Sequence, residues 1–234
     1  MSVYSVLTIL HISLGVVALV TFWAAGMAKK GSSLHMAAGK VYLGSMAGLL
    51  AAALPMSFYV LAARGPVTGG FLLYLVIITA TSVWSAWRAI RDKRDWARYT
   101  GVVYRVLMWL NLVGALGVVA LGLFLAQQMQ LVIVSFSAIG FVSFVQMWRF
   151  ARRAPADPRW WLRQHLSANL GNGVATHIAF LAIGLPRLVP ALANATWVNI
   201  AWLTPLAVAF VAGAWLTRKY LPKRTATRLA PQAG

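Results

Sequence analysis

The stretch FLLYLVIITATSVWSAWRAIRDKR, residues 71–94, joins a long apolar run to an abrupt cluster of positive charge. No charged residue interrupts the run before Arg88, and Arg91, Lys93 and Arg94 follow closely. A helix needs about 20 apolar residues to cross a hydrocarbon layer about 30 Å thick. The stretch therefore predicts a membrane-spanning helix that ends at a basic surface.

Similar apolar runs recur along the chain, which is 61% hydrophobic and only 10% charged, against about 25% charged residues in soluble domains. Seven spans are expected, over residues 3–28, 36–63, 70–90, 101–125, 130–150, 160–184 and 195–218. The alternating pattern of a membrane β-barrel is absent. We predict an all-α polytopic membrane helix bundle, with one seven-helix domain over residues 1–221 and a short basic cytoplasmic tail over 222–234.

The net charge of +18 is distributed unevenly over this topology. Of the 21 basic residues, 19 fall in the tail or near the linkers after the first, third and fifth spans, and only Arg64 and Arg187 fall on the other side. The positive-inside rule then places the N-terminus outside and the C-terminus in the cytoplasm. The positive charge is thus explained by membrane topology, with the lipid bilayer as the partner, and nucleic-acid binding is not expected. The chain has no cysteine, which excludes disulfides and thiolate-bound iron–sulfur or zinc sites.

The only four histidines fall at two depths of the predicted bundle. His11 and His177 each lie about eight residues from the outer end of their span, roughly 12 Å below the surface at 1.5 Å per residue. His35 and His165 stand at the cytoplasmic starts of the second and sixth spans. Ionisable side chains within a membrane are costly, so each of these residues is a candidate functional group.

Each depth offers two imidazoles, and this number favours one kind of metal centre. A protein zinc site needs three or four protein ligands, whereas haem iron already has four porphyrin nitrogens and needs only axial ligands. His165 and His177 are also twelve residues apart, about 18 Å along a helix, so the four histidines cannot share one ion. The sequence therefore predicts two b-type haems, an outer one on His11 and His177 and an inner one on His35 and His165.

Small residues lie one helical turn from three of these histidines, namely Gly15, Gly39 and Gly173. They would leave room for a flat macrocycle, although close packing of helices explains them equally well. Along the sixth span, Asn169 and Gly173 connect His165 to His177 in steps of four residues, and Asn172 and Thr176 are candidates to support the ligands.

Haem propionates need cationic partners near the surface. At the inner level, Lys40 and Arg163 lie close in sequence to the histidines, although topology alone explains most of the cytoplasmic charge. At the outer level, Arg64 and Arg187 are the only basic residues, and they do not serve topology. All four are expected to contribute to cofactor binding.

The leading functional hypothesis is a dihaem b-type cytochrome that carries electrons across the membrane, which would make it a membrane oxidoreductase. Its expected partners are a quinone, another small redox molecule or a redox subunit. The first alternative is a transporter or proton channel with the histidines as a relay, although no Asp or Glu lies within a predicted span. The second, weaker alternative is a membrane metallohydrolase, which would need a carboxylate near the metal.

Three stretches, HISLGVVALV (11–20), HMAAGKVY (35–42) and RQHLSANLGNGVATHIAF (163–180), carry a family resemblance. They resemble a family of bacterial multi-pass membrane proteins known as domain of unknown function twenty-three-oh-six. In that family an arginine usually follows the histidine of the second stretch, where this chain has Met36. The resemblance implies that all four histidines occupy motif positions and that the protein resides in a bacterial inner membrane. It implies no established activity.

Overall fold

A computed structural model describes residues 1–221, and the predicted tail at 222–234 lies outside the described residues. The described part is helical without any strand, and seven of its helices are long and apolar enough to cross a membrane. This confirms the all-α, multi-pass class. The spanning segments are α1 (Val3–Met27), α2 (Ser33–Arg64), α3 (Pro66–Arg91), α5 (Val102–Ala120) with the π-helical turn η1 (Leu121–Leu125), α6 (Gln130–Arg152), α7 (Trp160–Ile178) with the π-helical turn η2 (Ala179–Gly184) and α8 (Leu185–Leu188), and α9 (Ala195–Tyr220). Two short helices, α4 (Trp96–Tyr99) and η3 (Pro190–Leu192), lie in the connections.

Local sequence signals fix several helix ends. The Ser32 hydroxyl accepts a hydrogen bond from the His35 backbone N–H at 3.2 Å and begins α2, and Asn194 caps α9 in the same way. Between α2 and α3 stands the single residue Gly65, whose φ of +86° favours glycine, and Pro66 begins the next helix. A one-residue connection forces α2 and α3 to be antiparallel neighbours.

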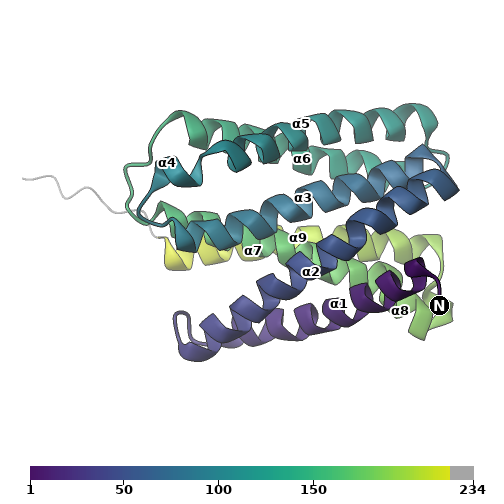
Figure 1. The fold of residues 1–234 in the computed structure, drawn as a ribbon, viewed down its shortest axis with the longest axis horizontal. Coiled ribbons are helices and arrows are strands. Elements are labelled where there is room, and N and C mark those ends of the chain that lie inside the picture. The colour runs from purple at the N-terminus through teal and green to yellow at the C-terminus, as the bar shows by residue number, and fades with distance from the viewer. Residues whose placement is uncertain (222–234) are drawn as a thin grey trace, which may run out of the picture.

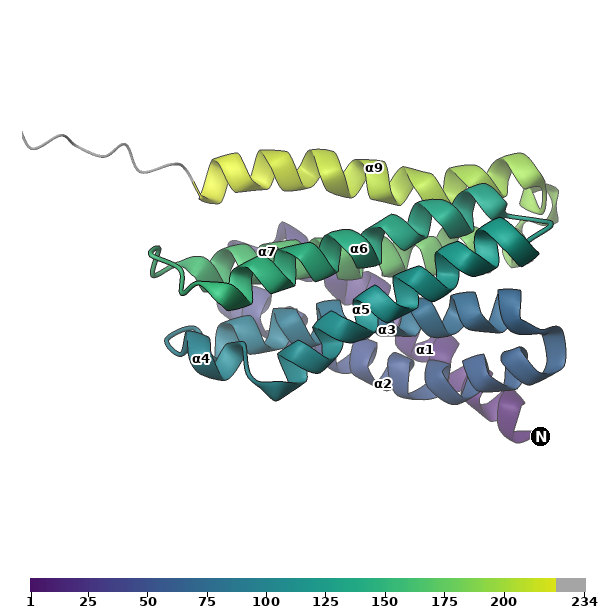
Figure 2. The same cartoon turned by 90° about the horizontal axis from the view of Figure 1, so that it is seen from above.

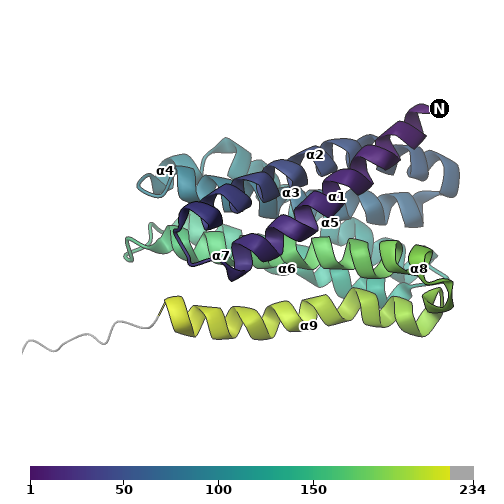
Figure 3. The same ribbon diagram turned by 90° about the horizontal axis from the view of Figure 1, so that it is seen from below.

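The helices form one elongated bundle in which α3 and α7 are central (Figure 1). Helix α3 packs against α2, α5 and α7, while α7 also contacts α1 and α9. Helix α9 lies at one edge of the bundle (Figure 2). Helix α1 pairs mainly with α2 and runs obliquely to α7 (Figure 3).

One end of the bundle collects the α1–α2 loop, α4, the α6–α7 loop and the last turn of α9 (Figure 1). We call it the basic end, because every basic residue of the described chain except Arg64 and Arg187 lies at or near it. The opposite end holds the N-terminus, the turn at Gly65 and α8. The charge asymmetry predicted from the linkers is therefore a property of the folded bundle.

Buried polar contacts hold the central helices in register. The Tyr74 hydroxyl on α3 donates to the Phe136 carbonyl at 2.8 Å and accepts from the Gly140 N–H at 2.9 Å, both on α6. The Asn111 amide on α5 donates to the Thr81 hydroxyl of α3 at 2.7 Å. Hydrogen bonds between membrane helices contribute about 0.6–2 kcal/mol each and specify which faces meet.

A buried carboxylate organises the basic end. Asp92 pairs with Arg88, and Arg98 Nε lies 3.5 Å from its second oxygen, while the Asp92 side chain is fully buried. The Arg88 guanidinium also lies over the Trp84 ring at 5.2 Å. Through Arg88 and Arg98, the Asp92 carboxylate joins the end of α3 to the segment around α4.

We expect Asp92→Asn to lower the free energy of unfolding by about 1–3 kcal/mol, because it removes the charge that the two arginines share. Both arginines keep some contact with solvent, which limits the loss. The measurement is denaturation of the purified protein in mixed detergent micelles. As a control, Asp157→Asn breaks an exposed pair with Arg159 at 3.7 Å and should cost less than about 1 kcal/mol. Equal losses for the two variants would contradict this role of Asp92.

Candidate functional site

All four histidines use the same ring nitrogen to contact a backbone carbonyl. The Nδ1–oxygen distances are 3.3 Å for His11 and Leu49, 2.9 Å for His35 and Ala25, 3.0 Å for His165 and Ala86, and 2.7 Å for His177 and Gly173. A carbonyl oxygen only accepts, so each Nδ1 must carry the proton. In the neutral ring Nε2 then keeps its lone pair, which is the arrangement typical of histidines that ligate metals.

The histidines of the basic end come from different helices but lie in one region. His35, in the first turn of α2, reaches back to the last turn of α1, and His165 on α7 reaches across to α3. Both His35 and Lys30 lie within electrostatic range of His165. This region therefore holds the two imidazoles that the sequence assigns to the inner level, although no hydrogen bond or ring contact of the described chain joins them.

Two polar side chains border this inner region. The Lys30 ammonium donates to the carbonyls of Ala25 and Gly26, where α1 ends, and so shares the Ala25 carbonyl with His35. Asn169 donates to the His165 carbonyl at 2.8 Å, and its amide nitrogen lies 3.3 Å from each ring nitrogen of His165. The His165 ring is thus held between the Ala86 carbonyl and the Asn169 amide.

The predicted outer pair has a different environment. His177 Nε2 accepts a hydrogen bond from the Trp23 indole at 3.1 Å, and the ring also contacts Phe22 with centroids 5.3 Å apart. His11 contacts α2 instead, and no hydrogen bond or ring contact joins it to His177 in the described chain. Trp23 lies twelve residues beyond His11, about 18 Å along α1. Helix α1 meets α7 at Phe22 and Trp23. These two side chains therefore contact the His177 ring, where the sequence predicted His11.

The three glycines have unequal roles. A Cβ on Gly173 would lie 2.6 Å from the Phe22 ring, so this glycine is needed for α1 and α7 to approach each other. A Cβ on Gly15 would make an ordinary contact of 3.7 Å with Leu49, and one on Gly39 would meet nothing within 4 Å. Close helix packing explains Gly173, while the space beside Gly39 lies one turn from His35.

The four cations expected to contact propionates lie at the ends that the sequence assigned to them. Lys40 and Arg163 are near the basic end, and Arg64 and Arg187 are at the opposite end. All four side chains are exposed, and none forms an ion pair with another described residue. They remain free to bind an anion near the surface.

A buried polar cluster lies between the two histidine levels of α7. The Thr176 hydroxyl donates to the Asn172 carbonyl at 2.9 Å and lies 3.1 Å from the Tyr42 hydroxyl and 3.6 Å from the Met46 sulfur. The Asn172 side chain is fully buried, and neither its amide nitrogen nor its oxygen has a protein partner. An unpaired buried amide costs about 1–3 kcal/mol, so Asn172 has the capacity to bind a further polar group.

The π-helical turn η2 begins two residues after His177. Such turns widen a helix locally and are frequent at functional sites. This feature, together with the contacts of Phe22 and Trp23, has no signature in the sequence pattern. Tryptophans near helix ends are typical of membrane interfaces, so their sequence positions did not point to Trp23.

Residues 1–221 contain no group of three or more His, Cys, Asp or Glu side chains placed to hold a metal ion. The described chain thus offers no zinc site of the three-ligand type. Two shallow hollows of about 360 and 460 Å³ lie on the outer faces of α5 and α9, and no histidine lines either of them.

Comparison of the chain with protein-family models, with curated proteins and with solved structures found no match. The resemblance to domain of unknown function twenty-three-oh-six therefore rests on the three histidine-containing stretches alone.

Proposed function

We propose that the protein is a b-type membrane cytochrome that carries electrons between two haem levels. The observation that carries the proposal is the common use of Nδ1 by all four half-buried histidines, which leaves a lone pair on each Nε2, the one on His177 being shared with the Trp23 indole. Supporting it, the described spans contain no carboxylate, and their lysines and arginines lie mostly toward the helix ends, whereas His11 and His177 lie well within α1 and α7.

The inner centre is assigned to His35 and His165. The Ala25 and Ala86 carbonyls would orient the two rings, and Asn169 would restrain His165 further. Lys40 and Arg163 would supply the positive charge for the propionates. The haem iron would supply the one-electron chemistry, while the protein provides axial ligation and a site of low dielectric constant.

The outer centre is assigned to His177, with His11 as its second ligand. Ligation by His177 would replace the hydrogen bond from Trp23, and Trp23 would then lie beside the centre. Arg64 and Arg187 are the cations of this level. In this structure Phe22 and Trp23 contact His177 directly, and about 18 Å of α1 separate Trp23 from His11, so ligation by both histidines requires α1 to move relative to α7.

The proposed orientation places the basic end in the cytoplasm and the N-terminus outside, following the positive-inside rule. Electrons would then pass between an outer donor or acceptor and a cytoplasmic one in a bacterial inner membrane. A quinone, a small diffusible redox molecule and a redox subunit are the classes of partner that fit such a path.

Proteoliposomes test this function. Ferricyanide is trapped inside, and a membrane-impermeant reductant is added outside. We expect the protein to accelerate loss of ferricyanide absorbance, and His165→Ala to abolish the acceleration. Gln164→Ala, a neighbouring change on α7, is the control and should retain it. If the vesicles instead show a proton flux that depends on His177 and no electron transfer, the relay alternative replaces the cytochrome.

A further inference from the structure

The outward face of α9 carries an apolar hollow that ends beside a cation. Its lining residues are Ala207, Val208, Val211, Ala212 and Trp215, and its volume is about 460 Å³. These positions recur every three or four residues, so they form one face of the helix, and Lys219 continues that face one turn further. Val208 and Val211 are 60% and 67% exposed, which leaves the hollow open to the surroundings along the helix.

Two aromatic rings and a second lysine, Lys30, lie at the end of this hollow that is nearest to Lys219. The Lys219 ammonium lies 4.8 Å from the Trp215 ring and 5.5 Å from the Tyr220 ring. Lys30 belongs to the α1–α2 loop, and this loop lies at the same end of the bundle as the last turn of α9 (Figures 1 and 3). Partial burial lowers the pKa of Lys30 below its ordinary value, and the positive charge of Lys219 lowers it further.

The positive charge of Lys219 acts on Lys30, and the repulsion between two such ammonium groups is relieved when an anion lies between them. No carboxylate of the described chain forms an ion pair with either lysine. The Lys30 ammonium is held by the carbonyls of Ala25 and Gly26, so its position is set by the end of α1. The site thus combines an apolar surface hollow with two lysine ammonium groups at its end.

We propose that this surface binds one anionic phospholipid, with an acyl chain along the α9 hollow and the headgroup phosphate between Lys30 and Lys219. Basic pockets at the cytoplasmic ends of membrane helices are suited to anionic headgroups. Trp215 and Tyr220 would lie at the glycerol level, where aromatic rings are favoured. This proposal does not depend on haem.

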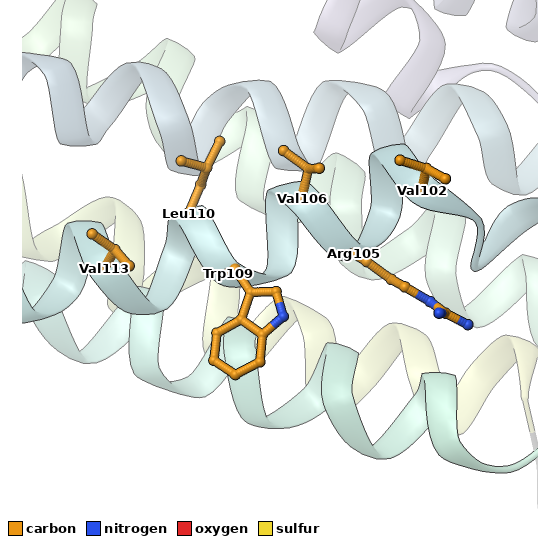
Figure 4. A pocket seen from close by; sticks show the side chains of 6 residues that line it. All are labelled: Val102, Arg105, Val106, Trp109, Leu110 and Val113. Atoms are coloured by element: carbon orange, nitrogen blue, oxygen red, sulfur yellow. The ribbon is translucent and has the colours of Figure 1, made fainter.

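The hollow on α5 provides an internal comparison. It is lined by aliphatic residues, Trp109 and Arg105, with Arg105 as the only cation among its lining residues (Figure 4). It resembles the α9 hollow in its apolar lining. Beside Arg105, however, no second cation of the described chain corresponds to the Lys30 that acts on Lys219 at the α9 hollow. Preference for a net negative lipid is therefore expected at α9.

Thermal unfolding of the purified full chain in neutral detergent tests the proposal. Phosphatidylglycerol, phosphatidylcholine and inorganic phosphate are titrated separately. We expect phosphatidylglycerol to raise the midpoint at lower concentrations than phosphatidylcholine, with no effect of inorganic phosphate. Lys30→Gln and Lys219→Gln should each weaken the apparent affinity for phosphatidylglycerol about fivefold, as expected for a basic residue near an anionic surface.

Lys93→Gln is the matched control, because Lys93 also lies over a tryptophan, Trp161, at 5.9 Å but borders no described hollow. It should retain wild-type affinity. Each comparison uses the difference between the unfolding midpoints with and without lipid for the same variant. A loss of basal stability in Lys30→Gln therefore does not obscure the result. Equal responses to both lipids, equal loss in all three variants, or a response to inorganic phosphate alone would overturn the proposal.

Discussion

Replacing His165 with alanine is expected to remove one of two haems and to leave the other in place. His165 is the inner ligand with the firmest support, because the Ala86 carbonyl and Asn169 fix its ring from two sides. Loss of one axial ligand from a paired site leaves a single histidine, and the haem should no longer be retained through purification. The expected change is about half of the absorbance at the haem Soret maximum.

The pairing of ligands is tested by combining substitutions. If His35 and His165 hold the same haem, the double variant should lose no more haem than either single variant, because residues that act as a unit are not additive. His177→Ala should remove the other half of the absorbance, and His165→Ala with His177→Ala should remove all of it. Gln164→Ala serves as the control for changes on α7. Unchanged haem content in His165→Ala would refute the assignment.

The second large effect concerns stability and involves Gly140 on α6. A Cβ at this position would lie 2.7 Å from the Asn111 carbonyl oxygen, 2.8 Å from the Tyr74 hydroxyl and 2.9 Å from Ala115. Because the Asn111 carbonyl is backbone, Gly140→Ala would force α5 and α6 apart and break the hydrogen bonds of Tyr74. We expect a loss of about 3 kcal/mol in the free energy of unfolding, from overpacking and lost hydrogen bonds together.

Gly117→Ala on α5 is the matched control, since a Cβ there would meet nothing within 4 Å. It should be neutral or stabilising by up to about 1 kcal/mol, because alanine favours the helix more than glycine does. Denaturation in mixed micelles measures both variants. A Gly140→Ala protein as stable as the wild type would contradict the close approach of α3, α5 and α6.

The helices were largely predictable from the sequence, because hydrocarbon thickness sets their length and charge marks their ends. The span expected at 70–90 corresponds to α3, and the basic cluster after it lies at the basic end. Differences are confined to helix ends. Helix α2 begins at Ser33 rather than at residue 36, since Ser32 caps it, and the sixth span continues through η2 and α8 to Leu188.

The candidate site was predictable in part. The positions of His35 and His165 along their helices follow from counting residues, and both residues lie near the basic end. The partner of His177 does not follow from counting, since it depends on where α1 crosses α7. That crossing is set by Phe22 fitting against Gly173, a contact between residues 151 positions apart. Period and depth carry no information on such a contact, so Trp23 was missed.

The central claim is that two pairs of imidazoles hold two haems in one bundle. The most direct measurement is the amount of haem per chain, from absorbance spectra of protein purified in detergent from cells grown with ample haem, recorded before and after reduction with dithionite. We predict two b-type haems per chain, with reduced bands that disappear in two separate halves in the histidine variants. Purified, folded protein without Soret absorbance would contradict the account and leave only the topology of the bundle.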